Sequence, residues 1–190
     1  MATFGSIYPY SSIYPGKFEG DPFAATIAAP SWDSDFTGMF NKGIRQVVAA
    51  SQITTGGTQV KVTFWASTAG TGIAVDGAFI GHQAVSGDAW DFDGGQVRLT
   101  FSTANGFDIS TGSSITSDPV AFTLDETKNL VLSAGVANDG AKDDTQEEFS
   151  TTGFDIYTKS GGLGEEGTTD VTGYSTTASN RMLFGEVLVA

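Results

Sequence analysis

The residues best suited to bind a cation lie in one short acidic stretch, 86–95, with the sequence SGDAWDFDGG. Asp88, Asp91 and Asp93 follow one another closely there, and Gly94 comes directly after them. Carboxylates that converge around a glycine turn are typical of Ca²⁺ loops. The EF-hand spacing and its distal Glu are absent, so the alternative is a solvated polar turn. The candidate cofactor is therefore Ca²⁺, with Asp88, Asp91 and Asp93 as its predicted ligands.

Two tryptophans are candidates for contact with a sugar or a protein partner. Trp90 lies inside the acidic stretch, and Trp65 occupies the outward phase of a predicted strand, next to inward Phe64. A tryptophan ring offers apolar area to the face of a pyranose, and neighbouring carboxylates orient the hydroxyls. We predict Trp90, Trp65 and Asp88 as glycan- or partner-binding residues. The alternative is that both rings pack under loops or at a subunit contact.

The sequence shows no catalytic centre that we can assign. A serine esterase needs a histidine held by an acid, and the single histidine, His82, has no Asp three residues before it. Gly87-Asp88 is followed by Ala89 where a nucleophile would stand. A glycosidase needs two carboxylates about 5–10 Å apart, and spacing singles out no such pair among the 22 acidic residues. We predict that the chain is not an enzyme and that His82 is structural.

Short alternating runs predict the strands that position these residues. Apolar and polar residues alternate over runs bounded by Gly, Asn and Asp, and no segment has convincing helical periodicity. The pattern predicts an all-β fold, a single antiparallel β-sandwich or jelly roll of about eight to ten strands. Strands are expected at 44–50, 58–66, 73–76, 78–84, 97–102, 119–124, 129–136, 153–158 and 181–189, with an acidic loop at 138–150. The predicted core contains Val60, Val62, Phe64, Leu99, Phe101, Val120, Phe122, Leu124, Leu130 and Leu132.

The N-terminal residues differ in composition from the rest. Ser6-Ile7-Tyr8-Pro9 recurs as Ser12-Ile13-Tyr14-Pro15, and four prolines in the first thirty residues oppose a regular helix. We predict an extended Pro/Tyr-rich arm and lead-in over 1–42, followed by the sandwich domain over 43–190. The arm either lies along its own sandwich or docks on a neighbouring subunit, because tyrosine-rich surfaces favour interfaces. The predicted arm contacts are Tyr8, Tyr10 and Tyr14.

Charge and cysteine content exclude several classes of partner. The formal net charge is −13, and nucleic-acid binding needs a basic face that displaces counterions. The same charge argues against an anionic membrane surface, and no apolar run reaches the length of a spanning helix. Without cysteine, disulfides and zinc–thiolate sites are excluded. The first residues lack the basic and apolar regions of a signal peptide, so we expect assembly in the cytoplasm.

Several motifs resemble a known family. The run Ile44-Arg45-Gln46-Val47-Val48, the run Val60-Lys61-Val62-Thr63-Phe64 and the turn Ser117-Asp118-Pro119-Val120 before a strand are similar to those of an accessory domain. This is the β-sandwich domain that precedes the catalytic domain in some SGNH (GDSL-type) esterases. The resemblance covers roughly residues 43–138 and implies a non-catalytic jelly-roll module. The chain departs from it in the acidic insertion at 86–95 and in a long tail without a hydrolase domain.

Together these features predict a non-catalytic attachment or decoration module on the surface of a bacteriophage or phage-like particle. The expected position is a capsid decoration, a head spike or a tail fibre, reached by assembly in the host cytoplasm and release by lysis. Other virion proteins are the expected partners of the arm, and cell-surface polysaccharide is the expected ligand of the sandwich. We expect an oligomer. The alternatives are a carbohydrate-binding accessory subunit of a hydrolase and a glycan-active enzyme.

Overall fold

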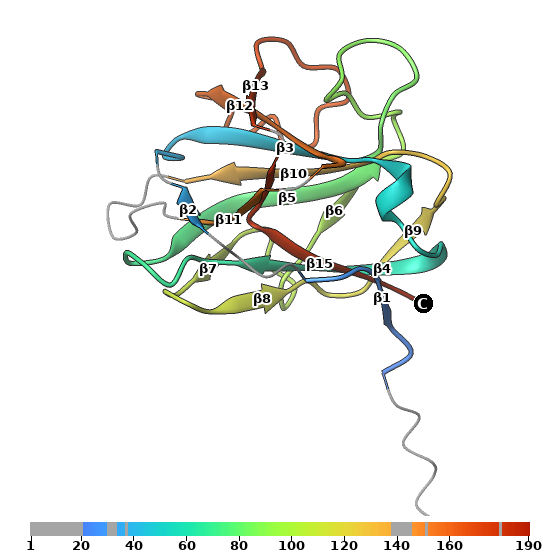
Figure 1. Cartoon of the computed structure of the whole chain (residues 1–190), viewed down its shortest axis with the longest axis horizontal. Helices are drawn as coiled ribbons and strands as arrows, with labels where there is room; N and C mark the ends of the chain where they lie inside the picture. Colours follow the sequence, from blue (N-terminus) through green and yellow to red (C-terminus); the bar gives the residue numbers. More distant parts are fainter. Residues whose placement is uncertain (1–20, 30–33, 37, 138–145, 151, 179) are drawn as a thin grey trace, which may run out of the picture.

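The computed structural model describes residues 21–29, 34–36, 38–137, 146–150, 152–178 and 180–190. These residues form two large antiparallel sheets, one above the other in Figure 1, so the predicted all-β sandwich is confirmed. One sheet contains five strands and the other contains seven. The fold is therefore two layers of sheet around one core.

The strands of the five-stranded sheet are β1 (Ala24–Ile27), β4 (Gly57–Trp65), β8 (Ser114–Thr116), β9 (Val120–Leu124) and β15 (Phe184–Val189). Those of the seven-stranded sheet are β3 (Lys42–Val48), β5 (Ile73–His82), β6 (Val97–Leu99), β7 (Phe107–Ile109), β10 (Leu130–Val136), β12 (Phe154–Ser160) and β13 (Ser175–Ala178). A small third sheet contains β2 (Ser34–Phe36), β11 (Gln146–Ser150) and β14 (Asn180–Met182). A single 3₁₀ turn, η1 (Ala50–Gln52), follows β3 within the described residues.

Alternating apolar residues from both large sheets fill the core. Every predicted core residue is buried except Val120, which is partly buried and packs against the others. Phe64 of β4 lies at the centre of an aromatic group, with ring centroids 5.5 Å from Phe101 and 4.9 Å from both Phe107 and Phe184. Aromatic pairs at these separations add to the stabilisation from buried area. The alternation in the sequence thus predicts the core face correctly.

The structure has more strands than expected, with fifteen among the described residues. Strands such as β7 and β8 have three residues each, too few to show an alternating pattern. The predicted strands 73–76 and 78–84 are one strand, β5, whose pairing with β10 shifts register between Val75 and Gly77. This bulge changes the phase of the alternation, which is why the sequence reads as two strands.

Residues 24–27 fall inside the range predicted for the arm, yet they belong to the sandwich. They form β1, which pairs with β15, and Thr26 and Ile27 are buried. The Thr26 hydroxyl donates to the Thr55 carbonyl at 2.5 Å and accepts from the Thr55 N–H at 3.1 Å. Residues 146–150, expected in an acidic loop, form β11. The described part of the sandwich therefore begins before residue 43.

A row of glycines crosses the outer face of the seven-stranded sheet. Gly43 of β3, Gly135 of β10 and Gly77 of β5 are register partners. A methyl group at Gly43 would collide with the Tyr174 hydroxyl, and one at Gly135 would collide with the Glu166 carboxylate. Glycine is needed here because the 161–174 loop approaches the sheet so closely. Figure 1 shows this loop, together with the 83–96 loop, above the seven-stranded sheet.

Candidate functional site

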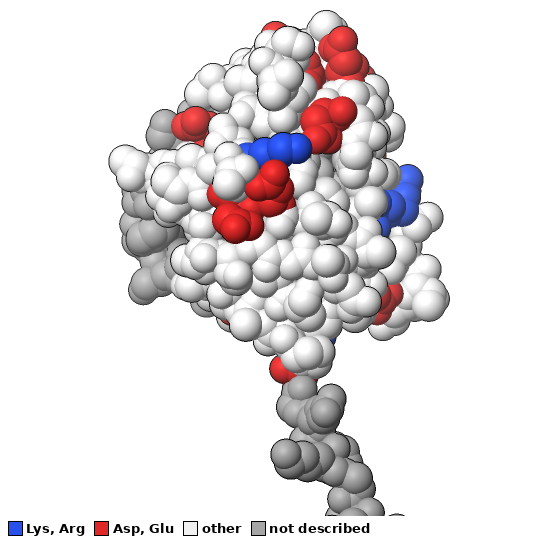
Figure 2. All heavy atoms as spheres, turned by 90° about the vertical axis from the view of Figure 1, so that its right-hand side faces the viewer, with Lys and Arg blue, Asp and Glu red and all other residues white. Residues whose placement is uncertain are grey.

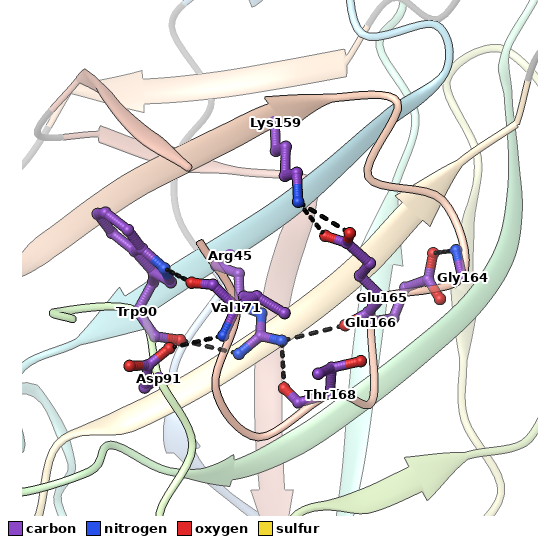
Figure 3. Close-up of polar contacts among 9 residues, drawn as sticks. All are labelled: Arg45, Trp90, Asp91, Lys159, Gly164, Glu165, Glu166, Thr168 and Val171. Carbon is purple, nitrogen blue, oxygen red and sulfur yellow. Dashed lines mark hydrogen bonds and ion pairs between the residues drawn. The ribbon is translucent and has the colours of Figure 1, made fainter. Parts of the chain in front are cut away.

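A buried arginine holds both loops against the sheet. Arg45, on the outer face of β3, has no exposed surface. Its Nη1 donates to the Trp90 carbonyl at 2.9 Å, and its Nη2 donates to the Thr168 and Glu165 carbonyls at 2.6 and 3.1 Å (Figure 3). The first acceptor belongs to the 83–96 loop and the other two belong to the 161–174 loop. One guanidinium therefore fixes two loops that are far apart in the sequence.

The guanidinium lies among aromatic rings. Its central carbon is 4.3 Å from the ring centroid of Phe92 and 5.7 Å from that of Tyr174. Burial lowers the pKa of Arg45, and the nearby Tyr174, Asp91 and Glu165 oppose this shift. Burial also raises the pKa of Tyr174 to about 12. Arg45 is thus a cation with carbonyl and aromatic partners, which suits a structural role.

The aspartates of the predicted Ca²⁺ site do not converge. Asp91 is buried, and its oxygens accept from the Asp88 N–H at 2.8 Å and the Val171 N–H at 3.2 Å. Asp93 accepts from the Gly95 N–H at 2.9 Å, and Asp88 is exposed. Within the described ranges, no three His, Cys, Asp or Glu side chains are arranged to hold a metal ion. Backbone N–H groups already occupy the Asp91 carboxylate, and Ca²⁺ binding by Asp88, Asp91 and Asp93 stays a prediction.

Trp90 belongs to the contact between the loops rather than to an open platform. Its indole N–H donates to the Val171 carbonyl at 2.8 Å (Figure 3). Its ring is half-buried, with centroids 5.1 Å from Tyr157 and 6.1 Å from Tyr174. The packing alternative from the sequence therefore describes its environment, and the prediction that it anchors a ligand remains a prediction.

Trp65 lies on the other large sheet. It ends β4 and is half-buried over Gly185 of β15, where a methyl group would collide with the indole. Its outward phase, next to buried Phe64, agrees with the sequence. Because Trp65 and Trp90 belong to different sheets and loops, the structure does not bring the two rings together with Asp88 in one site. The predicted arm residues Tyr8, Tyr10 and Tyr14 lie outside the described residues.

A groove of about 640 Å³ opens beside the 83–96 loop. One wall comes from the loop after β5, and another comes from the turn between β9 and β10. Its size is within the roughly 300–1,000 Å³ of small-ligand sites. The lining residues are Gln83, Ala84, Val85, Ser86, Phe92, Asp93, Thr127, Lys128 and Asn129. The groove is the strongest candidate for a binding site among the described residues.

Two amides connect the walls of the groove. The Asn129 Nδ2 donates to Gln83 Oε1 at 2.7 Å, and the Asn129 Oδ1 accepts from the Ala50 N–H at 2.9 Å. The Gln83 N–H donates to the Asn129 carbonyl at 2.9 Å, and its Nε2 donates to the Ala89 carbonyl. The turn between β9 and β10 is thereby tied to β5, to the 83–96 loop and to η1.

His82, the last residue of β5, also links this strand to the turn between β9 and β10. Its Nε2 accepts from the Asp125 N–H at 3.1 Å, while Nδ1 is 3.9 Å from Asp93 Oδ2. The imidazole packs against Phe122 at a centroid distance of 5.0 Å. Burial lowers the pKa of His82; Asp93 and Asp125 oppose this, and Lys128 adds to it. These contacts agree with a neutral, structural imidazole.

The face of the molecule shown in Figure 2 includes charges of both signs. Acidic side chains lie on either side of a basic one there, and no broad patch of a single sign forms. Lys128 and Asp93 both line the groove and supply one charge of each sign. Such a surface offers a ligand both hydrogen-bond donors and acceptors.

The residues that build the groove were not predicted from the sequence. Gln83 directly follows β5, and Asn129 directly precedes β10. Lys128 lies in the turn between β9 and β10. Polar residues next to apolar strands were a usable signal for a binding surface. The sequence does not show, however, that Gln83 and Asn129 contact each other, because they are 46 positions apart. Arg45 had a clearer signal, since it is a single charge within the otherwise uncharged run IRQVV.

Among the described residues, no helix has the length and apolar character needed to cross a membrane. No protein-family model matches the sequence, and a search of curated proteins finds no relative.

Proposed function

We propose that this chain is a non-catalytic attachment or decoration module on the surface of a phage or phage-like particle, and that its groove binds a saccharide. The observation that carries the proposal is the polar groove of about 640 Å³ beside loops fixed to a rigid sandwich. Loops held by a scaffold commonly form binding sites, because the scaffold lowers the entropy lost on binding.

The contacts of the titratable groups support a binding role rather than catalysis. His82 Nε2 accepts a backbone N–H, so this nitrogen is not available to activate a nucleophile. Asp91 accepts two backbone N–H groups and lies against the loops rather than in the groove. In both cases the side chain stabilises loop structure.

The place where the N-terminal segment joins the sandwich supports attachment by the arm. Lys61 of β4 pairs with Asp21 at 2.9 Å, and its ammonium is 4.1 Å from the Phe23 ring centroid. The lining of the groove includes no residue of β1 or β4. A partner held by the segment before Asp21 and a ligand in the groove would thus contact different parts of the chain.

Immunogold electron microscopy of lysates from the source culture tests the proposal. Antibodies against the chain should label sedimenting particles at regular positions on their surface. Labelling confined to the soluble fraction, with the chain co-purifying with a hydrolase, would instead support an accessory subunit of an enzyme. Turnover of a glycan by the purified chain would contradict the non-catalytic assignment.

A further inference from the structure

We infer that the groove takes a neutral oligosaccharide, held by hydrogen bonds to Gln83, Lys128 and Asn129 and by apolar contact with Val85. The inference rests on the proposed function and specifies the ligand class and the residues that recognise it. It places the ligand in the groove rather than against Trp90, which is not among the lining residues.

The two amides are fixed in orientation before any ligand binds. Asn129 uses one hydrogen of its NH₂ group on Gln83, and Gln83 uses one of its own on the Ala89 carbonyl. Each NH₂ group carries a second hydrogen that these contacts leave unused. Donors held in place in this way bind hydroxyl groups with little loss of side-chain entropy. Saccharide hydroxyls both donate and accept, so they suit such a lining.

The charges favour a neutral ligand over an acidic one. The chain has a formal net charge of −13, and Asp93 lines the groove together with Lys128. Asp125 and Glu126 precede Lys128 in the same turn. A uronic-acid or sialylated chain would meet repulsion from these carboxylates, whereas a neutral sugar would not. Lys128 Nζ donates no hydrogen bond to any described residue, so its donors are open to hydroxyls.

The backbone around the groove favours a saccharide over an extended peptide. Peptides that add to a sheet need an edge strand with unpaired N–H and C=O groups. Here β5 is paired with β10 and β6, and β10 is also paired with β3. The N–H groups of Gln83, Ala84, Asp93 and Lys128 all donate to other main-chain carbonyls. Recognition in the groove therefore depends on side chains.

Val85 supplies the apolar contact. Its side chain is fully exposed at the groove, whereas Phe92, the aromatic residue in the lining, is only 1% exposed. A valine offers a pyranose less area than an aromatic ring does. We therefore expect weak binding by a single chain and much tighter binding by many copies on one particle.

A glycan array followed by NMR titration tests the inference. The array presents neutral di- to tetrasaccharides beside uronic-acid and sialylated ones, and backbone amides around 83–86 and 127–129 should shift with the neutral hits. Lys128→Ala and Val85→Ser should each weaken binding about tenfold, close to the loss of one good contact. Lys42→Ala is the matched control for the lysine, since it lies at the far end of β3 from the groove.

Asn129→Asp removes the NH₂ group, with both the hydrogen that donates to Gln83 and the unused one, and should also weaken binding, with Asn105→Asp at an exposed position as its control. Val85→Ser should fold normally, because this fully exposed side chain contributes little to stability. A loss of binding in this variant is therefore not explained by misfolding. Binding that survives Lys128→Ala and Val85→Ser, but is lost in Trp90→Phe, would overturn the placement. Preference for acidic glycans, or amide shifts from peptides alone, would overturn the ligand class. Particles labelled with the chain but no saccharide bound would overturn this inference and the saccharide part of the proposed function, and would leave the attachment to a particle standing.

Discussion

The Arg45 guanidinium donates to the Trp90 carbonyl at 2.9 Å across 45 positions of the chain. This bond connects the outer face of β3 to the 83–96 loop, one wall of the groove. The same guanidinium binds two carbonyls of the 161–174 loop. The shape of the candidate binding surface therefore depends on a side chain that has no exposed surface and does not line the groove.

Replacing this arginine should destabilise both loops. Arg45→Met leaves three loop carbonyls without their buried donor, and we expect a loss of about 2–4 kcal/mol in the free energy of unfolding. Denaturant titration measures the loss. Hydrogen exchange should show faster exchange at Phe92, whose N–H donates to the Thr169 carbonyl at 3.0 Å. Arg98→Met is the control, because Arg98 is exposed and stacks on Phe79 at 4.5 Å. Equal effects of the two substitutions would contradict the role of Arg45.

Phe122 should be among the most costly core positions to truncate. Its side chain is buried and packs against His82, next to the groove. Phe122→Ala should lower the free energy of unfolding by about 3–5 kcal/mol, as large-to-small core changes do. Thr123→Ala, the exposed neighbour on β9, should change it by less than about 0.5 kcal/mol. If the free energies of unfolding of the two variants differed by less than about 1 kcal/mol, the Phe122 side chain would not be packed in the core as described.

The N-terminal boundary of the sandwich can be located by two deletions. Removing residues 1–20 should change stability by less than about 0.5 kcal/mol while abolishing assembly on the particle. Removing residues 1–29 also deletes β1 and buried Ile27, and it should cost at least about 2 kcal/mol. Thermal melts of the two proteins give the comparison. If the shorter deletion alone unfolds the chain, the arm packs on its own sandwich and the docking prediction is wrong.

His82 should make stability fall in mild acid. Burial lowers its folded-state pKa below the ordinary value of 6.5, so the unfolded chain takes up a proton more readily. The contribution is fully present above pH 6.5 and is lost as the pH falls through the folded-state pKa. Denaturant titrations between pH 7 and pH 5 should show a smaller slope for His82→Gln, whose amide oxygen can accept the Asp125 N–H. Because the chain has one histidine, its imidazole NMR signals report the titration directly. A midpoint above 6.5 would contradict the prediction.

The sequence by itself determined the fold class and the identity of the core. Alternation at Val60, Val62 and Phe64 predicts one face of β4, and those side chains are buried. The outward phase of Trp65 was also predictable, because side chains of a strand alternate between its two faces. Local chemistry is sufficient for these features, since each depends on residues within a few positions of one another.

The tertiary structure decided which outward faces are covered. Alternation places Arg45 on the outer face of β3, where a charged residue is expected to meet water. It is buried instead, because the 83–96 and 161–174 loops lie over it. The glycine row that admits the second loop exists only when Gly43, Gly135 and Gly77 are in register. Strand register depends on pairing between distant segments, which the order of residues within one strand does not reveal.

Contacts between distant segments also decide the arrangement of the candidate site. The spacing of Asp88, Asp91 and Asp93 resembles a cation loop, but the Val171 N–H, 80 positions after Asp91, occupies one of its oxygens. The groove likewise depends on the contact between Gln83 and Asn129, 46 positions apart. Composition indicates that polar loops are present, and only the packing of the sheets decides which of their side chains face one another.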